Sequence, residues 1–352
     1  MQADTVTLTP AGRSPLLGRL LRRTEFYLVV VILAAVVGLG VATPNFLTLS
    51  NFSNLANSYA VTGVLAAGLL VVLISGNIDI SFAATTMVAQ YLAALFALYV
   101  VGKPGLGVPV LDWAVVFAVA MAVGLGLGLV NAVIVSKFRA SSIIVTIATM
   151  NLFFGLLMFF SRGRQIFNLP PYFFKGILFQ LPLPDGGSFR FTIQMLALVL
   201  SLLATWALLN QTAIGRQIYA LGGNPEAAKR LGFGVFRLHL FVFGYLGVMA
   251  GVAAIIHAQL QQQVAPNVLV GRELDVLAAV VLGGASLLGG VGTVLGTVLG
   301  IALLAILQNG LIMVGVSSYW TQVCTGLVIL VSVCITALSD RMKTRRKSRG
   351  VV

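Results

Sequence analysis

The sequence predicts an all-α integral membrane protein, and three observations lead to that fold class. First, 59% of the 352 residues are hydrophobic and 9% are charged, whereas a soluble domain carries about 25% charged residues. Second, apolar runs of about 17–23 residues recur along the chain, and each is long enough to cross ~30 Å of hydrocarbon. Third, these runs lack the alternation of apolar and polar residues that a membrane β-barrel requires.

The apolar runs, separated by turn signals, predict about ten transmembrane helices. They are expected at about residues 26–42, 58–74, 82–101, 113–135, 142–160, 192–209, 239–257, 274–290, 293–309 and 319–338. Because ten is even, both termini are expected on the same side of the membrane. Sixteen of the 22 Lys and Arg residues then lie in segments on that side. Basic residues favour the cytoplasmic side, so both termini are predicted to be cytoplasmic.

The segments outside the spans define the expected organisation. A transmembrane domain, residues 26–338, is expected between an N-terminal cytoplasmic segment, 1–25, and a basic cytoplasmic tail, 339–352. The outside connection 161–191 contains four prolines and is either a structured cap or an ordinary loop; the connection 210–237 lies inside. The net charge of +13 is concentrated in loops and tails. It therefore indicates topology and contact with anionic membrane lipid rather than nucleic acid.

The stretch Leu274–Gly300 is unusually rich in glycine. Glycine weakens a soluble helix by roughly 1 kcal/mol relative to Ala, but in a bilayer it lets helices approach closely. Three glycines recur at four-residue spacing and are predicted to form a helix contact: Gly292, Gly296 and Gly300. The doublets Gly283–Gly284 and Gly289–Gly290 predict that the membrane segment is broken. Broken apolar helices place backbone groups beside a solute path.

The inside connection contains a segment with the signals of a short helix. Its residues are Asn224, Pro225, Glu226, Ala227, Ala228, Lys229 and Arg230, followed by Leu231 and Gly232. Asn224 is a favourable N-cap, Pro225 suits the first helical position, and Gly232 can end the helix in the left-handed conformation. The pattern predicts a two-turn helix, which is either an ordinary interfacial helix or one that fits a groove in a cytosolic partner.

Asp79 lies in a polar turn, Ser75–Ser81, between the second and third spans. An ionisable residue near membrane depth is a candidate for function. Asn77, Asp79 and Ser81 are therefore candidates for the substrate path. The alternative is structural, because Asp79 or Ser81 can cap the third span.

Several amide side chains interrupt otherwise apolar spans: Asn131, Asn151, Gln259, Gln308, Asn309 and Gln322. Such groups can replace water around a hydroxylated solute, although they more often hydrogen-bond neighbouring helices. Asn131 and Asn309 end the fourth and ninth spans and are further candidates for the path. Their matching positions predict inverted-topology repeats of spans two to five and seven to ten.

Missing motifs restrict the chemistry expected of this chain. The sequence has no G-x-x-x-x-G-K-[ST] phosphate loop, so ATP hydrolysis of that kind is not expected here. The two histidines, His239 and His257, lack metal-ligand spacing. No catalytic residue, metal site or bound cofactor is expected, and the chain is not predicted to be an enzyme.

Four stretches resemble the membrane subunit of bacterial ABC sugar importers, the ribose/xylose/arabinose-type permease family. They are GNIDISFAAT at 76–85, GLVNAVIVSKFRASSIIVTIATM at 128–150, GRQIYALGGNPEAAKRLGF at 215–233, and the stretch 273–330, which begins ELDVLAAVVLGGASLLGG. The chain departs from the family pattern at Asn77, where a second Gly is common, and at Phe82–Ala84, where Val-Gly-Ser is frequent. These departures lie near the expected path.

The resemblance implies a location in the bacterial inner membrane and a set of partners. These are a second permease chain, identical or different, two cytoplasmic ATP-binding subunits that use the ATP, and a periplasmic solute-binding protein. It implies that 161–191 is periplasmic, that 210–237 is a coupling loop, and that residues 224–230 contact the ATPase. The expected solute is a monosaccharide or related polyol. The alternatives are a branched-chain amino acid, a nucleoside or a signalling sugar, or an ATP-independent carrier.

Overall fold

The computed structural model describes most of the membrane domain. It covers residues 24–43, 45–102, 105, 109–174, 176–182, 187–317, 319–324, 326–327 and 330. The segment 1–23, most of the expected tenth span and the tail 339–352 lie outside the described residues.

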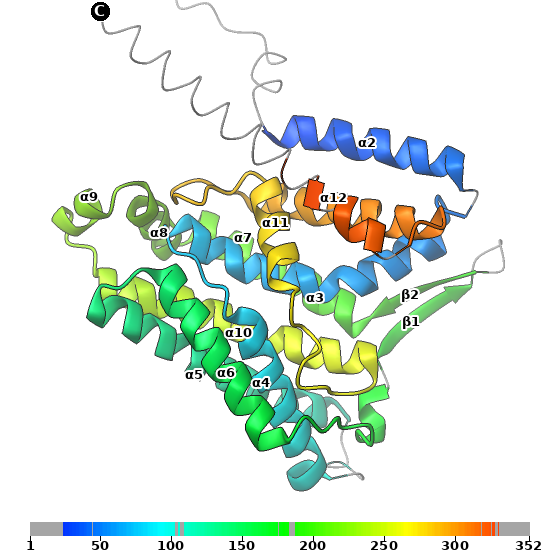
Figure 1. Ribbon diagram of the computed structural model, residues 1–352, viewed down its shortest axis with the longest axis horizontal. Coiled ribbons are helices and arrows are strands. Elements are labelled where there is room, and N and C mark those ends of the chain that lie inside the picture. Colours follow the sequence, from blue (N-terminus) through cyan, green and yellow to red (C-terminus); the bar gives the residue numbers. More distant parts are fainter. Residues whose placement is uncertain are drawn as a thin grey trace, which may run out of the picture.

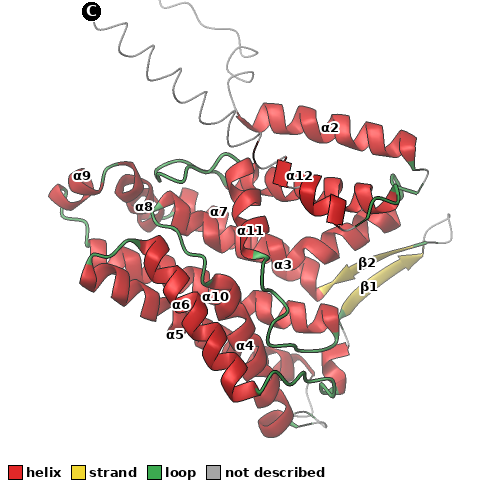
Figure 2. Ribbon diagram, viewed as in Figure 1, coloured by secondary structure: helices red, strands yellow, loops and turns green. Residues whose placement is uncertain are grey.

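Helices form nearly all of the described chain (Figure 2). The α-helices are α2 (Thr24–Ala42), α3 (Leu49–Ile74), α4 (Phe82–Phe96), α5 (Pro109–Phe138), α6 (Ser142–Ser161), α7 (Ile193–Gln211), α8 (Ala213–Gly223), α9 (Pro225–Arg230), α10 (Val235–Gln261), α11 (Glu273–Leu282) and α12 (Val294–Met313). A π-helical turn, η1 (Ala97–Val101), extends α4, and a 3₁₀ turn, η2 (Pro171–Phe174), precedes the strands β1 (Ile177–Pro182) and β2 (Ser188–Thr192). Among the described residues, eight helices are long and apolar enough to cross a membrane.

The expected span 274–290 is broken, as its glycine doublets predict, but its helical part is shorter than a membrane crossing. Helix α11 has 10 residues, which extend about 15 Å and cannot cross a bilayer core of ~30 Å. After Leu282 the chain enters a non-helical segment, 283–293, in which Gly284, Gly289 and Gly290 have positive φ values of 89°, 90° and 74°. An L-side chain disfavours this conformation. The glycine doublets therefore end the helix well inside the predicted span.

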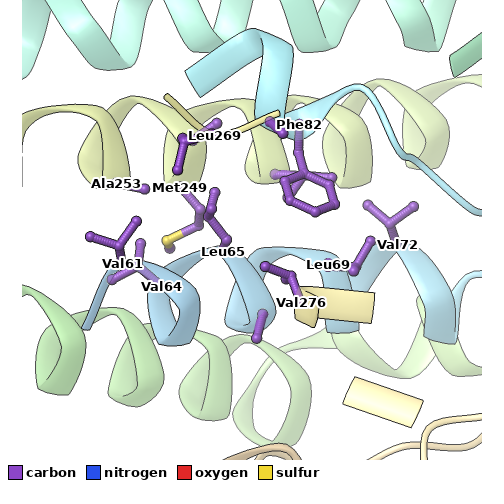
Figure 3. Close-up of a cluster of buried hydrophobic side chains, with 14 of the residues drawn as sticks. Val61, Val64, Leu65, Leu69, Val72, Phe82, Met249, Ala253, Leu269 and Val276 are labelled. Carbon is purple, nitrogen blue, oxygen red and sulfur yellow. The ribbon is translucent and has the colours of Figure 1, made fainter. Parts of the chain in front are cut away.

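Helix α3 lies at the centre of the fold. In its most apolar 18-residue stretch 78% of the residues are buried, whereas in that of α2 the share is 6%. Helices α10, α7, α12 and α11 pack around it. Figure 3 shows part of this core, where Leu65 and Leu69 of α3 lie near Met249 of α10 and Val276 of α11. Helix α2 packs mainly on α12 and leaves most of its apolar surface uncovered (Figure 1).

Helices α5 and α10 cross at very short range through small residues. A Cβ atom on Gly124 would lie 2.1 Å from the carbonyl oxygen of Gly247, and one on Gly128 would lie 2.4 Å from that of Phe243. Gly251 meets the backbone of Ala120 in the same way. Small residues four apart on both helices permit this contact. Sequence analysis singled out only the glycines of the C-terminal half.

Helix α3 is longer at its start than expected, and α8 is a helix within a connection expected to be a loop. Helix α3 begins at Leu49 rather than near residue 58, and Thr48 caps it by accepting a hydrogen bond from the Asn51 backbone N–H. Helix α8 occupies part of the expected inside loop. Its Ile218 and Leu221 are buried while Arg216 is exposed, so it is an amphipathic helix lying on the bundle.

The molecule has two distinct ends, which we call the α9 end and the hairpin end (Figure 1). The short helix α9 lies at one end, beside α8. The antiparallel strands β1 and β2 lie at the other, within the expected outside connection 161–191 and its continuation into α7. An isolated bridge between Ile166 and Val264 ties that connection to the segment after α10.

Candidate functional site

Helix α9 has the local structure that its sequence predicts. The Asn224 side-chain oxygen accepts a hydrogen bond from the Ala227 backbone N–H at 3.0 Å, and Pro225 is the first helical residue. Glu226 lies in the first turn, and Lys229 and Arg230 lie in the last. Gly232 follows with φ of 82°. The N-cap, the proline and the dipole-matched charges account for a stable helix of only six residues.

The side chains of α9 divide into one inward residue and an exposed charged surface. Ala228 is buried at 1% exposure, whereas Glu226, Ala227, Lys229 and Arg230 are exposed. The expectation that all of residues 224–230 contact a partner therefore needs a correction at Ala228. That methyl group packs against the chain's own core and is not available to a partner.

A cavity of about 560 Å³ lies between α9 and the connection from α5 to α6. Asn77, Arg139, Lys229 and His239 are among its lining residues. His239 Nδ1 pairs with Ser136 Oγ at 2.7 Å in the same wall. Asn77 is therefore placed at the α9 end of the molecule, where it borders a charged cavity.

Asp79, Ser81 and Asn131 form one buried hydrogen-bonded network. Asp79 Oδ1 accepts from both the backbone N–H and the hydroxyl of Ser81, each at 2.7 Å. Asn131 Nδ2 donates to Ser81 Oγ, also at 2.7 Å. Their exposed fractions are 3%, 0% and 0%. The structure thus brings three of the five path candidates together, in a network closed to solvent in this conformation.

The network shapes the start of α4 without capping its first turn. Ser81 occupies the N-cap position, but its side chain makes no capping hydrogen bond. Asp79 instead closes a turn by accepting the N–H of Ser81, two residues later, which is an Asx-turn arrangement. The simple capping interpretation of Ser81 is therefore wrong. In this conformation the Asp79 side chain holds the turn that leads into α4.

The start of α6 holds the same turn from the other side. Ser142 Oγ accepts the backbone N–H of Ile78 at 3.0 Å, and Thr146 Oγ1 accepts that of Ile80 at 3.2 Å. Sequence analysis missed both residues. The available signal was their four-residue spacing, which puts two hydroxyls on one helix face.

Asn309 does not join this network. Its Nδ2 donates to Asn51 Oδ1 at 3.0 Å, and the neighbouring Gln308 Oε1 accepts from Tyr59 Oη at 2.6 Å. Both bonds connect α12 to the first half of α3. Asn309 is therefore an interhelical contact residue in this conformation, distant from Asp79 along α3.

Two of the three predicted packing glycines lie on α12 against α11. A Cβ on Gly296 would lie 2.0 Å from the Gly283 carbonyl oxygen, and one on Gly300 would lie 2.0 Å from that of Ala279. Gly292 precedes α12 and faces Ile74 of α3, with a Cβ distance of 3.0 Å. The three glycines therefore serve two contacts rather than one helical stripe.

Five glycines from three segments meet at the α9 end, and we call this contact the glycine junction. Its members are Gly76, Gly222, Gly223, Gly289 and Gly290. A Cβ on Gly222 would lie 1.8 Å from the Ile74 carbonyl oxygen, one on Gly289 would lie 2.6 Å from Gly76 Cα, and one on Gly290 would lie 2.8 Å from Gly223 Cα. Only glycine permits backbones to approach this closely.

Two hydrogen bonds hold the glycine junction together. The Gly290 N–H donates to the Ile74 carbonyl oxygen at 2.8 Å, and Tyr219 Oη donates to the Gly292 carbonyl oxygen at 2.7 Å. The junction therefore connects α8, directly before α9, to the end of α3 and to the broken segment 283–293. The Asp79 turn follows Gly76 by three residues and belongs to the same region.

Comparison with known proteins gives a family for this arrangement. A family model described as "Branched-chain amino acid transport system / permease component" matches residues 51–333. The ribose import permease protein of Escherichia coli strain K12 is 32% identical over 334 residues, which cover 94% of this chain and 98% of that protein. The autoinducer 2 import system permease protein of Yersinia enterocolitica is 32% identical over 302 residues, covering 85% and 78%.

A third relative is named for a different solute. The galactose/methyl galactoside import permease protein of Haemophilus influenzae is 29% identical over 334 residues, covering 92% of this chain and 96% of that protein. No solved structure matches the chain. The family match, the length of these alignments and the eight membrane-capable helices agree, and the chain therefore belongs to this family of multi-pass membrane transport permeases.

Proposed function

We propose that the chain is the membrane-spanning subunit of an ATP-driven importer in the bacterial inner membrane, and that it moves a monosaccharide or related polyol. The three relatives named above, each aligned over most of its length, are import permeases for ribose, autoinducer 2 and galactose or methyl galactoside. The structural observation that carries the proposal is the glycine junction, because it joins an exposed helix to the segments that border the expected path.

In this proposal α9 is the contact with a cytoplasmic ATP-binding subunit. Its exposed Glu226, Lys229 and Arg230 supply charges of both signs for a complementary groove. The buried Ala228 fixes the helix to the membrane domain. A push on α9 is then carried into the bundle instead of being absorbed by a flexible loop.

The glycine junction supplies the route for that push. The backbones of its glycines are already in contact and have no side chains that could change rotamer to absorb a displacement of α8. The end of α3, the Asp79 turn and the segment 283–293 would move with α8. We infer that this movement opens and closes the path, and that Asn77, Asp79, Ser81 and Asn131 border it in another conformation.

The remaining partners follow from the surfaces and the expected topology. We propose a second permease chain, identical or different, two ATP-binding subunits at the α9 end, and a solute-binding protein at the hairpin end. This places 161–191 in the periplasm, 210–237 and both termini in the cytoplasm, and ten crossing segments in the bilayer. The ten include α11 with its extended continuation, and spans two to five and seven to ten form inverted repeats.

A second candidate function is import of a branched-chain amino acid, as the description of the family model indicates. The two candidates differ in the charges that they require. An amino acid carries an ammonium and a carboxylate, and each needs a partner in the path. Purification of the complete complex, with mass identification of its subunits and of the bound solute, separates the two.

The coupling role of α9 is tested on the complete complex in proteoliposomes. Ala227→Trp adds bulk on the exposed face of α9, and Ala213→Trp adds the same bulk on the exposed start of α8 as a control. We expect Ala227→Trp to insert normally but to separate ATP hydrolysis from sugar uptake, while Ala213→Trp keeps both. Unchanged uptake and unchanged co-purification of the ATPase with Ala227→Trp would remove α9 from the interface.

A further inference from the structure

A polar cavity of about 380 Å³ lies at the hairpin end. It is bounded by the first half of α3, the start of α7, the end of α10 and the base of the hairpin. The side chains that give it its character are amides and a hydroxyl: Asn54, Asn57, Ser58, Gln194, Gln259 and Gln262. Among the described residues that line the cavity, Arg190 is the one charged residue and none is acidic.

Two glutamines in the cavity wall are buried and carry amide atoms that bond to none of the described residues. Gln194 is 6% exposed and Gln259 is 5% exposed. The Oε1 atom of Gln194 and both Oε1 and Nε2 of Gln259 make no hydrogen bond to the protein. Buried amide groups are normally paired, and leaving them unpaired costs stability. Three unpaired amide atoms therefore lie in the wall of one cavity, where a polar ligand would supply the hydrogen bonds that the described residues do not.

The surrounding structure keeps the Gln259 amide in this position. A Cβ on Gly176 would lie 1.9 Å from Gln259 Nε2, so the glycine leaves room for the amide. The Gly176 carbonyl oxygen accepts the Ile193 N–H at 2.9 Å. Nearby, Thr192 donates to Asn57 Oδ1, and the Ser53 hydroxyl bonds the Arg190 backbone. These bonds join the hairpin, α3 and α7 into a fixed wall.

We propose that this cavity binds one neutral, monosaccharide-sized polyol at the hairpin end, as the site that receives solute before translocation. A sugar hydroxyl both donates and accepts, and a primary amide offers both functions on one flat group. The volume lies within the usual range of small-molecule pockets. This inference rests on the proposed function, and it names the residues that would hold the solute.

The same residues argue against the alternative solutes. An amino acid would find Arg190 for its carboxylate, but none of the described lining residues is an acid that pairs with its ammonium group. A phosphorylated sugar carries up to two negative charges, and Arg190 is the one cationic residue among the described lining residues to meet them. The unpaired groups are neutral amides, and they match uncharged hydroxyls best.

Gln90 provides a matched control for Gln259. Gln90, like Gln259, is a buried helical glutamine with an unpaired Oε1 atom. It lies between α4 and α10, where its Nε2 contacts His257 Nδ1 at 3.1 Å, and it does not line the polar cavity. Gln259→Met and Gln90→Met therefore remove the same amide with the same change in shape.

The test uses the complete permease–ATPase complex in nanodiscs, without the binding protein. Saturation-transfer NMR measures binding of D-ribose, D-xylose and D-galactose, with L-leucine and ribose 5-phosphate as charged probes. We expect at least one neutral sugar to bind in the millimolar range. Gln259→Met should weaken it about tenfold, the equivalent of roughly 1.4 kcal/mol, and Gln90→Met by less than about twofold. Asn54→Ala, at the exposed rim, should weaken binding severalfold while leaving the fold intact.

The possible results separate a failure of the proposed solute site from a failure of the proposed importer function. Equal sugar affinity for the parent, Gln259→Met and Asn54→Ala complexes overturns the site, and so does preferential binding of L-leucine or ribose 5-phosphate. ATP-driven sugar uptake that continues unchanged in both variants removes the site but keeps the proposed function. A parent complex that moves no sugar at all removes the proposed function itself.

Discussion

At the α9 end, three segments of the chain meet through glycine backbones. At the hairpin end, the neighbouring helices and strands meet through amide and hydroxyl side chains. At the five junction glycines, α8, α3 and the segment 283–293 meet backbone to backbone, and the Tyr219 side chain adds one hydrogen bond to the Gly292 carbonyl oxygen. At the hairpin end, bonds such as Asn51–Asn309 and Tyr59–Gln308 join the helices. Backbone contacts cannot adjust by changing rotamer, but side-chain contacts can. The first arrangement suits transmission of force, and the second suits adaptation to a solute.

The largest effect is expected when a side chain is placed inside the glycine junction, which tests whether the backbones there must stay in contact. We expect Gly222→Val to destabilise the protein by roughly 3 kcal/mol or more and to abolish complex assembly, because its Cβ would lie 1.8 Å from the Ile74 carbonyl oxygen. Reversible SDS unfolding and the yield of complex measure the effect.

The neighbouring residue supplies the control for this prediction. A Cβ on Gly223 meets no atom within 4 Å, so Gly223→Val should cost far less at nearly the same place in α8. If both variants assembled equally well, the junction would be more open than the structure shows, and the transmission argument would fail.

A second, smaller effect is expected where α11 meets α12. Gly296→Ala should lower the free energy of unfolding by about 1–3 kcal/mol, because its methyl group would lie 2.0 Å from the Gly283 carbonyl oxygen. Gly126→Ala on α5 meets no atom within 4 Å and should be neutral or slightly stabilising. Similar unfolding curves for the two variants would show that α12 can move away from the broken segment at little cost.

The Asp79 turn is held by side-chain hydrogen bonds although it lies at the α9 end, so it tests whether side-chain contacts there also affect transport. Asp79→Asn keeps an oxygen that accepts both Ser81 hydrogen bonds, so assembly should be retained with a stability loss below about 1 kcal/mol. We expect sugar uptake to fall severalfold while basal ATPase activity remains, because the charge is lost from the expected path. Parent-level uptake across the usable sugar concentrations would leave Asp79 a structural residue of the turn.

The comparison also shows what can be predicted from sequence. Helix α9 was predictable because its cap, its proline and its charges are consecutive residues, so local chemistry decides its structure. The break after Leu282 was predictable for the same reason, although the length of α11 was not. The second span was expected to begin near residue 58, which left Asn51 and Ser53 outside it. Both lie inside α3, where Asn51 bonds Asn309 of α12 and Ser53 bonds the Arg190 backbone of the hairpin.

The contacts between distant segments were not predictable. The glycine junction joins residues 76, 222 and 290, and the polar cavity joins residues 54, 194 and 259. Each glycine or glutamine looks ordinary within its own segment. Its role depends on which other segment it meets, and periodicity within one helix carries no such information. For the same reason the sequence could not show that Asn309 bonds Asn51 in this structure rather than joining the Asp79 network.

The smallest predicted effect concerns Asn309 and tests the side-chain contacts at the hairpin end. Asn309→Ala removes one interhelical hydrogen bond to Asn51, and such bonds contribute about 0.6 kcal/mol on average in membrane proteins. Asn151→Ala is the control, because the hydrogen bond that its amide makes within the described part of the chain stays in its own helix, to the Ile147 carbonyl oxygen. A double-mutant cycle of Asn51→Ala and Asn309→Ala, read by SDS unfolding, isolates the pair. A coupling above about 2 kcal/mol would mean that the hairpin end is as rigid as the glycine junction, and the contrast between the two ends would disappear.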